Sequence, residues 1–107
     1  MANTKLAVAA TLFLLGASSA RADDLTVFQE DKKFSETEVT IKRGETVTFT
    51  NKDPITHNVF SSTPGMAFDL KTQAPGSSST ITFDHVGEAE VRCAIHPQMK
   101  MKVNVTE

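Results

Sequence analysis

Beyond residue 24, apolar and polar residues alternate in short runs that are separated by turn residues. The clearest pair of runs is residues 39–41 and 46–50, which flank a turn containing Gly44. Because successive side chains of a strand point to opposite faces of a sheet, this pattern predicts a β-hairpin. Its inward face is expected to consist of Val39, Ile41, Val47 and Phe49.

The same alternation predicts further short strands at residues 25–28, 57–60, 80–83, 88–93 and 102–106. The longest irregular piece, residues 61–79, is rich in proline, glycine and serine, and a short helix around residues 66–71 is the one helical element that it favours. Many short strands with so little helix favour an all-β protein, folded as a two-sheet β-sandwich.

The first residues have a different character. Lys5 precedes an apolar run that ends by residue 17, and small residues flank Arg21 at a cleavage position after Ala22. This is the pattern of a secretory signal peptide, and the run is too short for a membrane span, which needs about 20 residues. We therefore predict a signal peptide over residues 1–22, a single domain over residues 23–107 and export to the periplasm.

The predicted exported part is mildly acidic. The full chain has a net charge of −2, and removal of the leader, which holds two basic residues and no acidic one, makes the charge −4. This balance disfavours nucleic acid and anionic membranes as partners. We expect a monomer that does not insert into a membrane.

Cys93 is the only cysteine of the chain, so it cannot form an internal disulfide. An exposed free thiol is a liability in an oxidising compartment, which predicts that Cys93 is buried or bound to a ligand. His96 and Met99 follow in the same loop, and they bring an imidazole and a thioether within seven residues of the thiol. His57 lies far upstream, at the start of another predicted strand.

This set of donors suits copper better than other metals. Two imidazoles and a thiolate with a weak axial thioether are the ligands of electron-transfer copper sites. A structural zinc site takes four cysteine or histidine ligands, and calcium or magnesium takes a cluster of oxygens. A single cysteine excludes a C-x-x-C-H haem attachment. The sequence therefore predicts one copper ion bound by His57, Cys93, His96 and a methionine.

Three segments resemble the small blue copper proteins, or cupredoxins, such as plastocyanin, pseudoazurin and amicyanin. They are the strand at residues 44–51, the His-Asn-Val sequence at residues 57–59, and the strand and ligand loop over residues 87–99. The ligand loop is most similar to that of amicyanin. The resemblance implies a Greek-key β-sandwich of about eight strands, with copper held by His57, Cys93, His96 and one methionine.

Two departures from the family pattern stand near the predicted site. Ala94 occupies a position that is commonly Thr, Ser or Gly, so one hydrogen bond between the two ligand segments is expected to be missing. Val91 and Ala89 replace the usual aromatic residues before the cysteine. The packing beneath the metal is therefore expected to differ from that of the family.

Met99 and Met101 compete for the axial position. Met101 shares its parity with Val103 and Val105, so all three face the core together if the last strand begins near Met101. Met99 comes where the chain is still turning, and the amicyanin-like loop length implies the same choice. The segment also resembles pseudoazurin, which implies Met101. We predict Met99, with Met101 as the alternative.

Three other residues near the motifs receive smaller roles. The backbone N–H of Asn58 is expected to donate to the sulfur of Cys93 and so to tune the metal. His85 is interpreted as a solvated turn residue and Met66 as a packing residue.

The predicted function is single-electron transfer by Cu(II)/Cu(I) cycling, with redox protein partners docking near His96. The alternative is a periplasmic copper carrier or copper-resistance protein on the same fold, which the neighbouring thioethers of Met99 and Met101 favour. An enzyme is not predicted, because copper enzymes of this superfamily need extra histidines and this chain has three in total.

Overall fold

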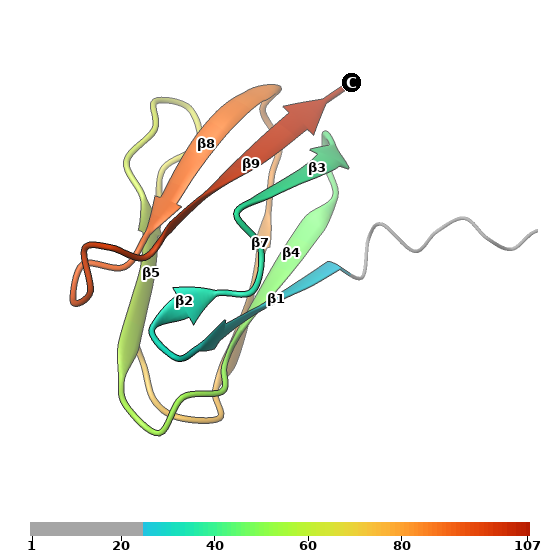
Figure 1. The fold of residues 1–107 in the computed structure, drawn as a ribbon. Coiled ribbons are helices and arrows are strands. Elements are labelled where there is room, and N and C mark those ends of the chain that lie inside the picture. The colour runs from blue at the N-terminus through green and yellow to red at the C-terminus, as the bar shows by residue number, and fades with distance from the viewer. Residues whose placement is uncertain (1–24) are drawn as a thin grey trace, which may run out of the picture.

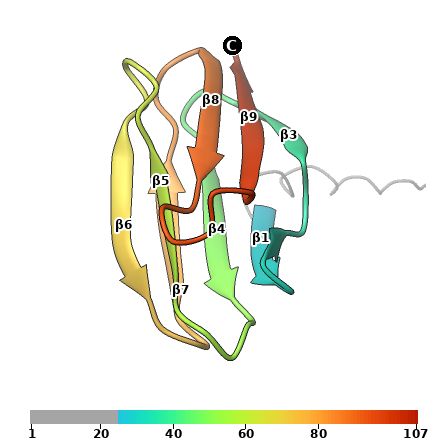
Figure 2. The ribbon, with the colours of Figure 1, turned by 60° about the vertical axis from the view of Figure 1, so that its left-hand side comes forward.

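The computed structural model describes residues 25–107, which form nine strands in two sheets (Figure 1). One sheet has the order β2-β1-β4-β7, formed by Lys33–Phe34 (β2), Leu25–Glu30 (β1), Thr46–Asn51 (β4) and Ser78–Thr82 (β7). The other has the order β3-β9-β8-β5-β6, formed by Glu38–Lys42 (β3), Lys100–Thr106 (β9), Gly87–Arg92 (β8), His57–Ser61 (β5) and Phe68–Gln73 (β6). Figure 2 shows these five strands following one another across the molecule.

The predicted all-β sandwich is confirmed. Alternating side chains from both sheets bury a shared core, and its completely buried members include Val27, Val47, Phe49, Val59 and Val103. Residues 25–107 contain no helix that is long and apolar enough to cross a membrane. The predicted signal peptide, residues 1–22, lies outside the described residues.

The predicted hairpin of residues 39–41 and 46–50 is wrong in its pairing. β3 pairs in parallel with β9, whereas β4 pairs with β1 and β7 in the other sheet. Alternation cannot distinguish two strands that lie side by side from two strands that face each other, because both arrangements bury the same apolar faces. The turn between them bonds to β9 and to the residue that follows β7: the Arg43 N–H donates to the Thr106 carbonyl and the Gly44 N–H to the Phe83 carbonyl.

The predicted helix around residues 66–71 is also wrong, since most of this segment belongs to the edge strand β6. Phe68 and Leu70 pack against the core while Asp69 between them is exposed. This alternation is short, and it is interrupted at Lys71, which has a φ of 61°. The strand therefore has too little regular pattern to be recognised without its partner β5.

The topology gathers three connections at one end of the sandwich. β5 begins at His57, β8 ends just before Cys93, and the loop between β8 and β9 spans residues 93–99. β1 runs parallel to β4, so the turn that joins β1 to β2 reaches the same end as the loop between β4 and β5. Loops held by rigid sheets in this way commonly carry a functional site.

Candidate metal centre

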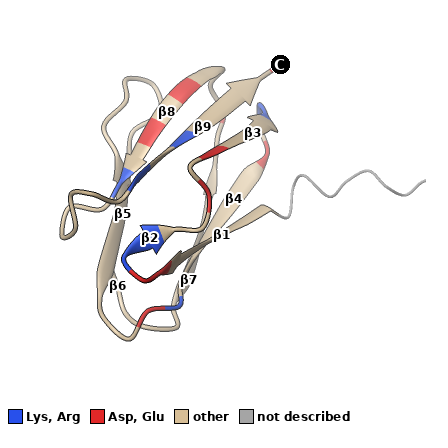
Figure 3. Ribbon diagram, viewed as in Figure 1, with Lys and Arg blue, Asp and Glu red and all other residues tan. Residues whose placement is uncertain are grey.

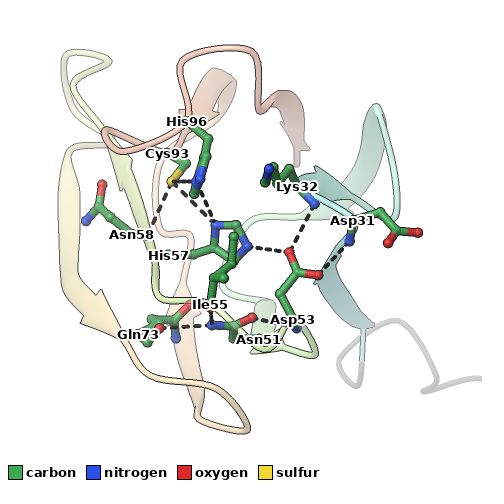
Figure 4. Close-up of polar contacts among 10 residues, drawn as sticks. All are labelled: Asp31, Lys32, Asn51, Asp53, Ile55, His57, Asn58, Gln73, Cys93 and His96. Carbon is green, nitrogen blue, oxygen red and sulfur yellow. Dashed lines mark hydrogen bonds and ion pairs between the residues drawn. The ribbon is translucent and has the colours of Figure 1, made fainter.

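Three of the four predicted ligand residues converge at this end of the sandwich (Figure 4). Their donor atoms are Nδ1 of His57, Sγ of Cys93 and Nδ1 of His96. The two nitrogens lie 3.1 Å apart, and the sulfur lies 3.9 Å from each of them. Within residues 25–107 this is the one cluster of three or more His, Cys, Asp or Glu side chains with the spacing of a metal site.

The triangle has the dimensions of a transition-metal site. A point in its plane and equidistant from the three atoms lies about 2.1 Å from each, close to typical metal–imidazole lengths of about 2.0–2.1 Å and metal–thiolate lengths of about 2.3 Å. Neutral imidazole nitrogens and a thiolate are electron-pair donors, so a cation between them satisfies all three. Two imidazoles and one thiolate in a trigonal arrangement are the donors that electron-transfer copper takes.

The three residues differ in their exposure. His57 and Cys93 are fully buried, and His96 is partly exposed. The expected burial of the lone thiol is therefore found, with Cys93 at 1% exposed. One side of the centre is thus sealed from water while one imidazole edge reaches the surface.

Both candidate methionines are 2% exposed, but they differ in backbone setting. Met101 lies within β9 opposite Val91, and it is buried together with Val103 and Val105, as their shared parity predicted. Met99 precedes the strand and closes the ligand loop. Its N–H donates to the His96 carbonyl at 2.9 Å, and its carbonyl accepts from the Cys93 N–H at 3.3 Å. Met99 is therefore the methionine that the loop ties directly to both Cys93 and His96.

Asn58 connects the two ligand segments. Its backbone N–H donates to Cys93 Sγ at 3.4 Å, which confirms the predicted contact. Ala94 offers no side-chain hydrogen bond, as expected, but its backbone N–H donates to Asn58 Oδ1 at 3.1 Å. The Asn58 amide also donates to Asp69 Oδ1 and to the Lys71 carbonyl, each at 2.9 Å. One side chain thus holds the cysteine loop and the edge strand β6 together.

Replacing Asn58 with Ala is expected to destabilise the copper-free protein by about 1–3 kcal/mol, because the truncation removes three hydrogen bonds of a buried amide. Urea unfolding measures this loss. Asn104→Ala is the matched control, since Asn104 bonds to Glu38 on an exposed part of the surface. Equal stabilities of the two variants would contradict the role of Asn58.

Asp53 is a part of the centre that sequence analysis missed. Nε2 of His57 lies 2.6 Å from Asp53 Oδ2. Burial alone would raise the pKa of Asp53, but hydrogen bonds from His57 and from the backbone amides of Lys32 and Asp31 outweigh it and lower that pKa. An ionised carboxylate only accepts hydrogen bonds, so Nε2 carries the proton of the ring. Nδ1 of His57 is then left with a free electron pair that faces the metal position.

The remaining histidine and an upstream methionine stand apart from the metal cluster. His85 is exposed in the connection between β7 and β8, as interpreted from the sequence. Met66 is partly buried against the core, which agrees with a packing role.

Comparison with known proteins gives a consistent result. The family model of copper binding proteins of the plastocyanin/azurin family matches residues 22–106. Amicyanin-alpha of Methylorubrum extorquens is 41% identical over 76 residues, which cover 68% of this chain and 64% of that protein, just under two thirds of its length. The methylamine utilization protein MauL of the same organism is 30% identical over 101 residues, which cover 94% of this chain and 86% of that protein.

A solved structure extends the likeness to three dimensions. The crystal structure of amicyanin from Paracoccus versutus has a TM-score of 0.70 and 35% sequence identity, and the match covers 82% of this chain and 86% of that one. The sandwich, the donor triangle and the family match all lead to one conclusion. This chain belongs to the plastocyanin/azurin family of copper-binding proteins, and copper is its metal.

Proposed function

We propose that this protein is an exported, periplasmic blue copper protein that carries single electrons between redox partners. His57, Cys93 and His96 would bind the copper in a plane, and Met99 would be the axial ligand. The observation that carries the proposal is the triangle of one sulfur and two nitrogens, with sides of 3.1 and 3.9 Å, at the end of a rigid sandwich.

Bound copper supplies a one-electron Cu(II)/Cu(I) couple, and the thioether of a weak axial methionine favours Cu(I). The chain holds the donor atoms in place and keeps water away from them. Cys93 and His57 are held by hydrogen bonds from Asn58 and to Asp53, so their donor atoms need not move when the charge of the site changes. Because both residues are buried, few water molecules have to reorient. His96 is the partly exposed ligand, and electrons would enter and leave through its ring.

The surface around His96 suits an apolar contact with a partner. The loop of residues 93–99 has no charged residue, whereas β8 and β3 carry charges of both signs and β9 carries two lysines (Figure 3). We define the docking rim as four exposed apolar residues of the two ligand loops: Pro54, Ile55, Ile95 and Pro97. Ile55 and Ile95 are 37% and 48% exposed. Exposed apolar residues that lack charge are typical of the core of a protein interface.

Placing a carboxylate in this loop is expected to slow electron transfer without changing the copper spectrum. Pro97→Asp and Gln98→Glu should each reduce the rate of electron self-exchange between the Cu(I) and Cu(II) forms about tenfold, since two like charges would meet when two copies dock. NMR line broadening in mixtures of the two forms measures this rate.

The control for this experiment is Ser62→Asp, which adds the same charge just beyond β5, at the end opposite its first residue, His57. Its self-exchange rate is expected to equal that of the wild type. Wild-type rates in both loop variants would count against docking at this surface.

The alternative function is copper carriage or copper resistance, which two neighbouring thioethers favour. However, Met101 is a buried strand residue opposite Val91 and does not reach the surface as a second soft donor. A carrier must release copper, whereas an electron carrier must retain it in both oxidation states. Repeated reduction and reoxidation in the presence of a Cu(I) chelator distinguishes the two: retained copper supports electron transfer, and loss of copper to the chelator supports carriage.

We do not propose an enzyme. A catalytic copper oxidase or reductase needs a second metal site where substrate binds, and His85, the third histidine of the chain, is exposed and stands outside the metal cluster. The one cluster present in the described part of the chain would already be used as the ligand set of the proposed electron-transfer site.

A further inference from the structure

We propose that Asp53, clamped by the turn between β1 and β2, is a positioning residue that fixes the ring of His57 and lowers the reduction potential of the copper. The effect on potential rests on the proposed function. The fixing of the ring concerns the chain itself and holds with or without the metal.

Both oxygens of the Asp53 carboxylate are engaged (Figure 4). Oδ1 accepts from the N–H of Asp31 at 2.7 Å, and Oδ2 accepts from the N–H of Lys32 at 3.0 Å and from Nε2 of His57 at 2.6 Å. The side chain is 6% exposed. A carboxylate with donors on both oxygens cannot rotate freely, so the third partner, the imidazole, is held in a fixed orientation as well.

The turn that supplies the two amides is unusual. It is a two-residue loop, Asp31 and Lys32, between paired residues Glu30 and Lys33, with φ values of 55° and 58°. Two successive positive φ values define a type I′ turn, which normally takes Asn and Gly. A lysine in this conformation is strained, and strain of this kind persists where the surrounding structure enforces it, often beside a functional site.

Asp53 provides the enforcing contact. β2 has two residues, so this hairpin has little pairing of its own to hold it in place. The carboxylate accepts the amides of both turn residues, and the turn in exchange holds the carboxylate against His57. A segment more than 20 residues away in sequence therefore determines how a metal ligand is oriented.

The carboxylate also acts through its charge. It is a fixed, buried negative charge in hydrogen-bond contact with the imidazole whose other nitrogen faces the metal. A nearby negative charge stabilises Cu(II) more than Cu(I), and burial reduces its screening by salt and water. The charge of Asp53 thus lowers the reduction potential of the copper, whereas the axial thioether, which favours Cu(I), raises it.

Asp69 offers a matched comparison at the neighbouring edge strand. Its Oδ1 accepts from the N–H of Lys71 at 2.8 Å and from the Asn58 amide at 2.9 Å, and Lys71 also has a positive φ. Asp69 is exposed, and its hydrogen bonds are to groups other than an imidazole. Asp69→Asn therefore removes the same charge from a similar backbone setting. Its Oδ1 can still accept both hydrogen bonds, and the hydrogen bond between His57 and Asp53 is left unchanged.

The test compares Asp53→Asn with Asp69→Asn by two measurements. The first is the reduction potential of the copper-loaded protein, which should shift upward in Asp53→Asn and by a much smaller amount in Asp69→Asn. The second is the solvent exchange of the Nε2 proton of His57 in the copper-free protein, followed by ¹⁵N NMR. This exchange should accelerate at least about tenfold in Asp53→Asn and remain at the wild-type rate in Asp69→Asn.

Asp53→Glu distinguishes the effect of the negative charge from the effect of the carboxylate's position. It also replaces Asp53→Asn as the test variant if that protein does not fold. The longer side chain keeps the charge but displaces the carboxylate from its two amides, so proton exchange should accelerate while the potential shifts less than in Asp53→Asn. Equal potentials in Asp53→Asn and Asp69→Asn, or an unchanged exchange rate at His57, would overturn the inference and leave the proposed function standing. A wild-type protein without a reversible copper couple would refute the proposed function, and the exchange measurement would still test the clamp.

Discussion

Replacing Cys93 with Ser is expected to abolish the intense thiolate-to-copper charge-transfer band and to weaken copper binding by more than about 100-fold. Changes to groups that merely hydrogen-bond to a metal ligand already cost about 10–100-fold in affinity. Here the substitution removes the proposed thiolate ligand itself, from which the charge-transfer band would arise. The serine hydroxyl stays protonated at neutral pH and cannot replace a thiolate that lies 3.9 Å from both imidazole nitrogens.

The visible absorption spectrum and a copper affinity measurement check this result. The control is Ala94→Ser, which adds a hydroxyl at the next position of the same loop, where the side chain is exposed and the backbone N–H is bonded to Asn58. That variant should remain blue with wild-type affinity. A Cys93→Ser protein that is still blue would exclude Cys93 as the copper ligand.

Met99→Leu is expected to change the copper spectrum and the reduction potential strongly, whereas Met101→Leu should leave both close to the wild type. Met99 is buried in the ligand loop, where its backbone bonds to Cys93 and His96. Met101 lies two residues further on, within β9, in register with Val91 and on the same face as Val103. A leucine at position 101 nearly conserves volume, so its effect should be a stability change below about 1.5 kcal/mol.

Electron paramagnetic resonance and voltammetry of the two variants measure the effect on copper, and urea unfolding measures the effect on stability. Each variant is the control for the other, since both lose one buried thioether. If Met101→Leu alters the spectrum and Met99→Leu does not, Met101 is the axial ligand.

Most of the strands were predictable, but their partners were not. The alternation of residues 46–50 identifies β4 and its buried face, because burial on one side of a strand leaves a period of two in the sequence. Nothing in that period reveals that β3 lies in the other sheet, since Ile41 and Phe49 bury equally well in either arrangement. The edge strand β6 was missed because its alternation ends at the irregular residue Lys71.

The cluster of candidate ligands was predictable because its chemistry is rare. A lone cysteine followed by His96 and Met99 stands out in any exported chain, and the predicted bond from the Asn58 N–H to Cys93 follows from its place beside His57. Asp53 was not predictable, because an aspartate before a proline looks like any turn residue. Its role depends on two amides that lie 21 and 22 residues upstream, and only the folded chain brings them together.

The most direct test of the account is a titration of the copper-free protein, residues 23–107, with Cu(II), followed by visible absorption. An intense charge-transfer band should grow to saturation at one equivalent of copper, disappear on addition of one electron per protein and return fully on reoxidation. This is the behaviour of one thiolate-bound copper ion that cycles without leaving. A spectrum with no such band, or a band that does not return because reduction has released the copper, would contradict the proposed electron carrier.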